Sequence, residues 1–259
     1  METPDPVHGL EEQLRLKPLP RHVGVIMDGN GRWAEKRGLT RVEGHREGST
    51  SVREVTRCAR RLGIQALTLY AFSSQNWSRP ADEVAALMDL LIEYLEKERE
   101  ELLGNGIRMN LIGDIDRLPR RVRDPMRRVR EESARNSAMV LTLALSYGGR
   151  EEILRASRTL AERAAQGAIS AAKVDEATFE SFLWTSGLPP LDLVIRTGGE
   201  RRLSNFLLWQ AAYAELVFLD TLWPDMRAEQ FLRCLEDFQN RERRFGLTGA
   251  QVRTTDTVR

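Results

Sequence analysis

Short apolar runs alternate with longer amphipathic segments along most of this chain, and this alternation restricts the fold more than any other feature. The runs have the length of strands, and the segments between them carry apolar residues at helical spacing. The predicted strands are residues 23–27, 66–72, 107–112, 139–146, 191–195 and 214–219. The predicted helices are residues 43–62, 81–103, 119–136, 151–165, 175–184 and 228–245. This order predicts an α/β fold with a mostly parallel, six-stranded central sheet flanked by helices.

One domain is expected, because no linker, repeat or low-complexity stretch divides the middle of the 259 residues. Residues 1–20 are rich in proline, and we expect them to form a flexible segment. Residues 21–246 are expected to form the domain, and residues 247–259 a flexible tail. The N-terminus lacks the basic start and apolar block of a signal peptide, and no run of about 18 apolar residues occurs. We therefore expect a cytoplasmic protein.

Composition excludes several classes of function. The chain has 39 basic and 38 acidic residues, a net charge of +1, so there is no global electrostatic case for binding nucleic acid. The two cysteines, Cys58 and Cys234, lie far apart and lack the spacing of metal ligands. Three histidines are too few for a histidine-rich metal site.

The first predicted strand runs directly into Asp28-Gly29-Asn30-Gly31-Arg32-Trp33 and then an apparent helix. In an α/β protein this places an acid and free backbone N–H groups at the carboxyl end of a strand, where ligands bind. Glycines permit close approach, and a helix N-terminus and an arginine attract phosphate. The acid would repel a phosphate unless a cation such as Mg²⁺ lay between them. The alternative is a polar turn without a ligand.

Two further strand ends carry polar residues. Ser73, Asn76, Trp77 and Arg79 follow the second strand, and the segment 196–206 follows the fifth. Carboxyl ends of parallel strands converge on one crevice. The segments 28–32 and 196–206 both contain glycines and arginines, and together they suit a pair of diphosphates. The arginines could instead make ordinary surface ion pairs. The aspartate-rich clusters of all-helical prenyl-transfer enzymes and the nucleophile elbow of serine hydrolases are absent from the sequence.

Several long motifs occur in an order that resembles the cis-prenyltransferase family. They are His-Val-Gly-Val-Ile-Met-Asp-Gly-Asn-Gly-Arg-Trp-Ala (22–34), Arg-x-x-Gly-His (41–45), Leu-Tyr-Ala-Phe-Ser-Ser-x-Asn-Trp-x-Arg-Pro (69–80), Tyr-Gly-Gly-Arg (147–150), Arg-Thr-Gly-Gly-Glu-x-Arg-x-Ser-Asn-Phe (196–206), Trp-Pro-Asp (223–225) and Arg-Glu-Arg-Arg-Phe-Gly (241–246). The resemblance implies a Mg²⁺-dependent homodimer that condenses isopentenyl diphosphate repeatedly onto farnesyl diphosphate. Each new double bond would be cis, and the product would be a long, undecaprenyl-type precursor of a cell-wall lipid carrier. It also implies an apolar tunnel for the product, with peripheral membrane contact for its release.

The resemblance also assigns roles to individual residues. Asp28 and Glu215 would contact the metal ion, and Asp28, His45, Ser73 and Asn76 would serve catalysis. The substrate contacts implied are Gly29, Asn30, Gly31, Arg32, Trp33, Arg41, His45, Ser73, Ser74, Gln75, Trp77, Arg79, Arg196, Arg202, Leu203 and Ser204. Ser73 to Arg79 would lie on a mobile loop that excludes water, and Arg196, Arg202 and Ser204 would bind isopentenyl diphosphate. Arg241–Gly246 would complete the site of the second subunit.

Some assignments stay open. The family pattern makes Asn76 a proton acceptor, but a carboxamide is a poor base, and we expect it to position a water, a diphosphate oxygen or His45 instead. Ala71 and Met139 would face the tunnel, although plain core packing fits them equally well. The chain departs from the family pattern at Gln75, Ser146 and Arg201. A synthase of shorter products is one alternative, and a non-catalytic partner subunit is another.

Overall fold

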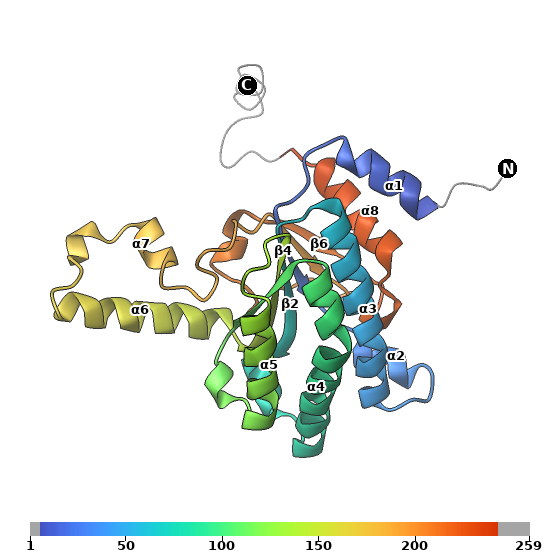
Figure 1. The fold of residues 1–259 in the computed structure, drawn as a ribbon, viewed down its shortest axis with the longest axis horizontal. Helices are drawn as coiled ribbons and strands as arrows, with labels where there is room; N and C mark the ends of the chain where they lie inside the picture. Colours follow the sequence, from blue (N-terminus) through green and yellow to red (C-terminus); the bar gives the residue numbers. More distant parts are fainter. Residues whose placement is uncertain (1–5, 243–259) are drawn as a thin grey trace.

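Six parallel strands form one sheet in the computed structural model, which describes residues 6–242 (Figure 1). They are β1 (His22–Ile26), β2 (Ala66–Ser73), β3 (Ile107–Ile112), β4 (Met139–Tyr147), β5 (Leu193–Arg196) and β6 (Glu215–Phe218). Their order in the sheet is β3-β4-β2-β1-β5-β6, and every neighbouring pair is parallel. The predicted α/β class and the six-stranded sheet are confirmed.

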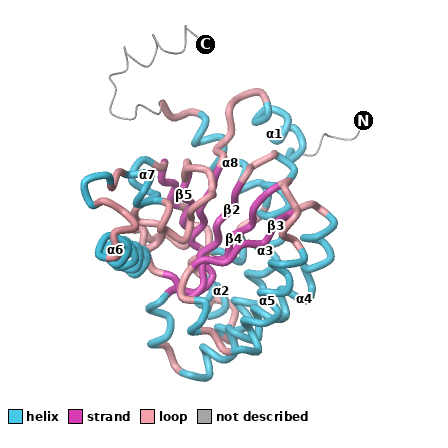
Figure 2. Tube along the Cα trace, turned by 60° about the vertical axis from the view of Figure 1, so that its left-hand side comes forward, coloured by secondary structure: helices cyan, strands magenta, loops and turns pink. Residues whose placement is uncertain are grey.

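Helices cover one face of the sheet, as the tube in Figure 2 shows, and the chain between β5 and β6 packs on the other. The first face carries α1 (Pro6–Arg15), α3 (Arg41–Leu62), α4 (Ala81–Gly104), α5 (Arg120–Glu132) and α8 (Ala228–Gln239). Strand residues point alternately to the two faces. In β2, for example, Leu67 and Leu69 join the core under the helices, whereas Tyr70 packs in the second core with Tyr147 and Phe206.

Three shorter or peripheral helices complete the fold. The six-residue α2 (Asn30–Glu35) follows β1 almost at once, as the sequence indicates. The long α6 (Gly149–Ala165) reaches away from the sheet with α7 (Glu176–Glu180) beside it (Figure 1). Where one helix was predicted at 175–184, the structure has five helical residues followed by turns. The predicted helix at 228–245 ends at Gln239.

The packed helix α1 corrects the prediction of a flexible segment over residues 1–20. Leu10 and Leu14 lie one helical turn apart and are buried, and the Gln239 amide of α8 donates a hydrogen bond of 2.8 Å to the Leu14 carbonyl. The prolines do not prevent this, because Pro6 occupies the first helical position, where the missing N–H costs nothing. The predicted tail 247–259 lies outside the described residues.

Helices α3 and α4 lie side by side and are joined by ion pairs along their length. Among the described residues these pairs are Arg41–Glu83 (3.4 Å), Arg46–Glu93 (3.5 Å), Arg53–Glu98 and Arg57–Glu101. Helix α3 begins with a reciprocal capping box between Thr40 and Glu43 and ends at Gly63, whose φ of 80° suits a left-handed cap. The two helices therefore form a defined wall beside β2.

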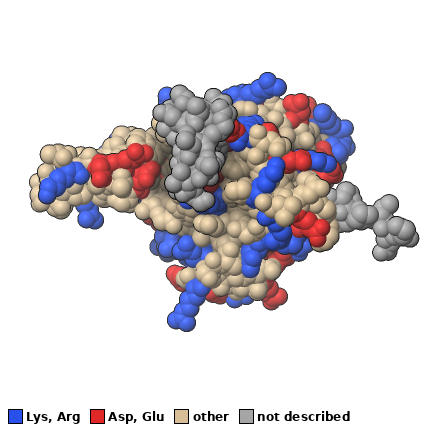
Figure 3. Space-filling view, turned by 90° about the horizontal axis from the view of Figure 1, so that it is seen from above, with Lys and Arg blue, Asp and Glu red and all other residues tan. Residues whose placement is uncertain are grey.

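Acidic and basic side chains are interspersed over the face of the molecule seen from above (Figure 3). This view agrees with the near-zero net charge of the chain. Within residues 6–242, no helix combines the length and apolar character needed to span a bilayer.

Candidate active site

The sheet register brings the three predicted polar strand ends together. Ile26 at the end of β1 is paired with Tyr70 of β2 on one side and with Arg196 of β5 on the other. Asp28 follows two residues after Ile26, and Ser73 ends β2. The predicted convergence on one edge of the sheet is therefore confirmed.

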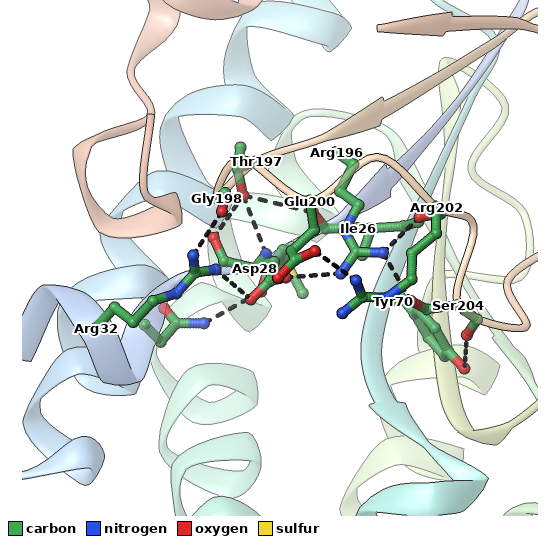
Figure 4. Close-up of polar contacts among 12 residues, drawn as sticks. Ile26, Asp28, Arg32, Tyr70, Arg196, Thr197, Gly198, Glu200, Arg202 and Ser204 are labelled. Carbon is green, nitrogen blue, oxygen red and sulfur yellow. Dashed lines mark hydrogen bonds and ion pairs between the residues drawn. The ribbon is translucent and has the colours of Figure 1, made fainter. Parts of the chain in front are cut away.

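Asp28 lies between two guanidinium groups, as Figure 4 shows. Arg32 of α2 approaches one carboxylate oxygen at 3.1 Å, and Arg196 of β5 donates to the other at 2.8 Å. Thr197 fixes the backbone of Asp28, because its hydroxyl accepts a hydrogen bond from the Asp28 N–H at 3.0 Å and donates one to its carbonyl at 2.7 Å. The acid is thus held in a defined position but remains about one-third exposed (31 %).

Glycines let the two loops approach each other around this acid. Gly198 has a φ of +87°, and a Cβ there would lie 2.6 Å from an Arg32 nitrogen and 3.1 Å from the Asp28 backbone. A Cβ at Gly31 would lie 2.9 Å from the guanidinium carbon of Arg41. Arg32 donates at 2.7 Å to the Gly198 carbonyl, which joins the first loop to the second. The backbone around residues 29–31 is therefore flanked by two arginines.

The second loop is held in an unusual backbone conformation. Ser204, Asn205 and Leu207 have positive φ angles of 48°, 65° and 44°. Such angles are costly outside glycine and persist only where the surroundings impose them. Here Phe206 stacks on Tyr70 at 4.6 Å, and Arg196 donates to the Ser204 hydroxyl at 2.7 Å and to the Arg202 carbonyl. These contacts present Arg202 and Ser204 at the crevice.

A crevice of about 840 Å³ lies over this edge of the sheet. Its lining consists of Ile26, Met27, Asp28, Tyr70, Ser73, Gln75, Asn76, Arg79, Arg150, Arg196, Arg202, Ser204, Asn205 and Leu208. Eight of these are predicted site residues. Sequence reasoning missed Tyr70, Arg150 and Asn205 as lining residues, although all three fall inside the quoted motifs. Four arginines in one crevice make it suitable for phosphate groups.

A smaller apolar cavity of about 160 Å³ adjoins the crevice and shares Met27, Tyr70, Asn76 and Arg79 with it. It lies between β2 and the wall formed by α3 and α4, and Ala71 lines it. Its apolar lining from the helices includes Val52, Leu87, Leu90, Leu91 and Tyr94. The buried side-chain oxygen of Asn30 has no hydrogen-bond partner among the described residues. Met139, the other predicted tunnel residue, is buried in the core and does not line this cavity.

His45 lines the apolar cavity from the second turn of α3. Burial, together with the positive charges of Arg79 and Arg41, lowers the pKa of His45 to about 4. The imidazole is therefore neutral at pH 7 in the ligand-free protein. A neutral ring can accept a proton or donate a hydrogen bond, and a bound diphosphate would make protonation easier.

The loop after β2 is a short 3₁₀ helix, Ser74–Ser78, packed against the sheet edge. Ser73 and Asn76 cap each other: the Asn76 side-chain oxygen accepts from the Ser73 N–H at 2.9 Å, and the Asn76 N–H donates to the Ser73 hydroxyl. Trp77 donates to the Ser146 hydroxyl at 2.9 Å, and Arg79 pairs with Glu83 at 3.0 Å. Trp77 is therefore turned away from the crevice and toward β4.

Two other predicted contacts point elsewhere. The indole N–H of Trp33 donates to Asp225 at 2.7 Å, and Arg37 lies over the ring. Leu203 packs against the second hydrophobic core. Neither side chain lines the crevice or the apolar cavity.

Glu215 lies at the opposite edge of the sheet from Asp28. It is paired with Leu193 at the start of β5, and Leu193 is paired with Val23 at the start of β1. At about 3.3 Å per residue the two acids are separated by at least ~10 Å along the strands and by two strand spacings across them. The Glu215 carboxylate binds Arg241 at 3.0 Å instead. Asp28 and Glu215 of one chain therefore do not lie close enough to contact the same ion, and the role of Glu215 as a metal contact, implied by the family resemblance, stays a prediction.

The fold and the site define a class: parallel α/β enzymes whose arginine-lined crevice suits diphosphates and adjoins an apolar cavity. Residues 26–246 match the family model described as "Putative undecaprenyl diphosphate synthase". The chain is 48 % identical over 240 residues to a ditrans,polycis-undecaprenyl-diphosphate synthase, (2E,6E)-farnesyl-diphosphate specific, from Shewanella oneidensis, covering 93 % of this chain and 87 % of that protein. This chain belongs to the undecaprenyl diphosphate synthase family and is a prenyltransferase.

Solved structures are similar over most of the chain. A lavandulyl diphosphate synthase from Lavandula x intermedia, in complex with dimethylallyl diphosphate, has a TM-score of 0.86 at 38 % identity and covers 88 % of this chain and 98 % of its own. A probable undecaprenyl diphosphate synthase from Campylobacter jejuni has a TM-score of 0.72 at 35 % identity, with coverage of 88 % and 99 %.

Proposed function

We propose that this protein condenses isopentenyl diphosphate repeatedly onto farnesyl diphosphate and releases a long, undecaprenyl-type cis-polyprenyl diphosphate. One observation carries the proposal: Asp28 lies between two arginine-bearing loops in a crevice that adjoins an apolar cavity. Two diphosphates and one hydrocarbon chain would occupy these spaces together. The relative from Shewanella oneidensis, specific for (2E,6E)-farnesyl diphosphate, supports the choice of primer.

The two loops would take different diphosphates. The glycine-containing turn before α2, with Arg32 and Arg41, adjoins the apolar cavity through Asn30 and would hold the allylic diphosphate. Arg196, Arg202 and Ser204 would hold isopentenyl diphosphate. The buried Nε of Arg196 has no hydrogen-bond partner among the described residues, so one donor is still available for an anion. Arginine suits such a role because its planar group can donate two parallel hydrogen bonds.

Asp28 fits a magnesium ion that is held jointly with a substrate. Mg²⁺ in proteins is usually bound by one or two carboxylates together with phosphate oxygens and water. Within residues 6–242, no group of three or more histidine, cysteine or acidic side chains is arranged to hold a metal. The ion would thus depend on the bound diphosphate for ligands, and when present it would neutralise charge on the leaving group.

Proton removal after bond formation would not use Asn76 as the base. Its side-chain oxygen is already engaged with the Ser73 N–H, and a carboxamide has little basicity. We infer that Asn76 positions another acceptor, either a diphosphate oxygen, a water or the neutral His45. Closure of the loop around Asn76 would keep water from the allylic cation.

The length of the product would be set by the apolar cavity beside β2. Ala71 is small and leaves space, whereas a growing chain stops when it meets a wall. The 160 Å³ present here would have to widen for a long product, through separation of α3 from α4. The likeness to lavandulyl diphosphate synthase keeps a shorter product as a second candidate.

A homodimer would cover apolar side chains that one chain leaves exposed. Leu154 on α6 and Tyr213 before β6 are 51 % and 71 % exposed. We propose that α6, which projects from the body in Figure 1, packs against a second copy. The product is a lipid, so peripheral contact with a membrane would assist its release.

The decisive experiment is a chain-length assay. The purified protein is incubated with radiolabelled isopentenyl diphosphate, farnesyl diphosphate and Mg²⁺, and the products are separated by chromatography. Products of about undecaprenyl length support the proposal, whereas one or two additions identify a short-chain synthase. No turnover by a folded homomeric sample would favour a non-catalytic subunit.

A further inference from the structure

Glu151, in the first turn of α6, joins the loop after β2 to the loop after β5. One of its carboxylate oxygens accepts hydrogen bonds from the Ser74 hydroxyl at 2.8 Å and the Gln75 amide at 3.3 Å. The other accepts from the Asn205 side chain at 2.8 Å. These three donors come from the two segments that surround the crevice, and none of them belongs to α6.

Asn205 belongs to the loop after β5 and is also hydrogen-bonded to the start of α6. Its side-chain oxygen accepts from the Arg150 N–H at 2.8 Å, and its carbonyl accepts from the Gly149 N–H at 2.7 Å. Asn205 adjoins Ser204, whose hydroxyl is bound to Arg196. Hydrogen bonds therefore connect Ser74 through Glu151 to Asn205, and the backbone connects Asn205 to Ser204, which is hydrogen-bonded to the arginine that pairs with Asp28.

Gly148 provides the room that this contact needs. A Cβ at Gly148 would lie 2.1 Å from the Glu151 oxygen and 2.5 Å from the Asn205 amide nitrogen. The φ of Gly148 is −158°, which any residue can adopt, so backbone freedom does not explain a glycine here. Close approach of the carboxylate to Asn205 does explain it.

The carboxylate of Glu151 is ionised under ordinary conditions. Burial opposes its charge, but hydrogen bonds from Asn205 and Ser74 outweigh that effect and lower the pKa of Glu151. Hydrogen bonds to a charged acceptor are stronger than those between neutral groups. One charged group therefore links two loops that are distant in sequence.

We propose that Glu151 is a positioning residue that couples occupation of the Arg196–Arg202–Ser204 loop to closure of the Ser73–Arg79 loop. The proposal rests on the function proposed above, with isopentenyl diphosphate bound at the first of these loops. A diphosphate that orders Ser204 and Asn205 also orders Ser74 and Gln75 through the shared carboxylate. Asn76 and Arg79 then lie over the crevice when the second substrate is in place.

A simpler role is possible for an acid in the first turn of a helix, where it stabilises the helix dipole. The two roles predict different changes on substitution. An acid that serves only α6 affects hydrogen exchange in α6. An acid that couples the loops affects exchange in residues 73–79, which are distant in sequence.

Hydrogen–deuterium exchange with mass spectrometry distinguishes the roles without turnover. The full chain is compared with and without isopentenyl diphosphate, and no allylic primer is added. In the parent protein we expect the ligand to slow exchange in both residues 73–79 and residues 199–206. In Glu151→Gln and Gly148→Ala we expect protection of 199–206 to persist and protection of 73–79 to fall severalfold. Gly148→Ala keeps every polar group but forces the Glu151 carboxylate and the Asn205 amide to move.

Glu162→Gln is the matched control, because Glu162 is an exposed acid on the same helix. It should behave as the parent. In steady-state assays, both test variants should raise the KM for isopentenyl diphosphate and lower kcat, each by roughly fivefold. The resulting fall of roughly 25-fold in kcat/KM is the size expected for loss of a hydrogen bond to a charged group.

The outcomes are separable. Full protection of residues 73–79 in both test variants overturns the coupling and leaves the proposed function intact. Loss of protection confined to α6 assigns Glu151 to the helix alone and also overturns it. If isopentenyl diphosphate protects neither loop in the parent, the substrate assignment itself is wrong, and the coupling falls with it.

Discussion

Asp28 and Arg196 form an ion pair of 2.8 Å between the ends of β1 and β5. Arg196 is 4 % exposed, so in the ligand-free protein the acid is the main counterion of a buried guanidinium. A diphosphate that binds Arg196 competes with Asp28 for it, and the freed carboxylate oxygen becomes available to a cation. Binding of the metal and binding of the diphosphate are therefore expected to reinforce each other.

Asp28→Asn should abolish most activity while the fold is retained. The amide keeps the size of the side chain but removes the charge that would bind Mg²⁺ and balance Arg32 and Arg196. We expect kcat to fall by at least ~100-fold, as for loss of a group that stabilises developing charge. Steady-state kinetics and circular dichroism together check this. Asp116→Asn, which alters an exposed acid paired with two arginines of α5, should keep full activity.

Gly198→Ala should lose activity because the added Cβ collides with a neighbour. Gly38→Ala separates this steric effect from the cost of a positive φ. Gly198 and Gly38 both have positive φ angles, +87° and +67°, so an alanine at either position costs roughly 1 kcal/mol of unfolding free energy. A Cβ at Gly38 meets nothing within 4 Å, whereas at Gly198 it collides with Arg32. Both variants should be slightly destabilised in urea titrations, but Gly198→Ala alone should lose turnover. Equal activity of the two variants would contradict the view that close packing of the loop after β5 against Arg32 is needed for activity.

Ala71→Leu should shorten the product. The added methyl groups would fill part of the 160 Å³ cavity beside β2, so the growing chain would meet a wall earlier. We expect the distribution of products to shift to fewer additions with little change in the first condensation. Chromatography of the labelled products measures this. Ala134→Leu, at an exposed position after α5, is the control and should leave chain length unchanged.

His22→Gln should weaken the dependence of stability on pH. Burial lowers the pKa of His22 to about 4, and its ring lies 2.7 Å from the Thr68 hydroxyl. In the unfolded chain a histidine titrates near 6.5, so the unfolded state gains protons first as pH falls from about 6.5 toward 4. As pH falls through that window, His22 therefore lowers the free energy of unfolding by roughly 3 kcal/mol.

Urea unfolding at pH 7.5, 6 and 5 tests this expectation. The buried His45 contributes in the same direction. The slope of unfolding free energy against pH in His22→Gln should therefore fall by the contribution of about one proton, and the rest of the slope should remain. His8→Gln, which alters a side chain that is 70 % exposed, should keep the parent's slope. An unchanged slope in His22→Gln would show that the pKa of His22 is the same in the folded and unfolded states, which contradicts the lowered pKa.

The fold followed from periodicity because local pattern and final structure agree along most of the chain. Strand runs such as 66–72 and helices such as 81–103 are long and strongly patterned, and each lies within two residues of the observed element. Helix α1 was missed for a physical reason. Its two buried leucines gain stability only by packing on α8, more than 200 residues away, and prolines in the flanks hid the helical spacing.

The sequence predicts the position of site residues that come directly after a strand. It does not predict the position of residues whose place depends on how the strands pair. Asp28, Ser73 and Arg196 converge because parallel strands end at a common edge. Glu215 lies at the start of a strand, and only the pairing of β6 with β5 shows that this places it at the far edge. Glu151 carries no motif of its own, since its partners come from two distant loops.

The row of arginine–glutamate pairs between α3 and α4 has a consequence for the hydrocarbon that would grow beneath it. Charge attraction at a surface fades as salt rises, whereas apolar packing does not. The contact between α3 and α4, which would cover the growing hydrocarbon chain, therefore depends partly on ion pairs that salt weakens. Ionic strength then becomes one of the variables that decide how far these two helices spread.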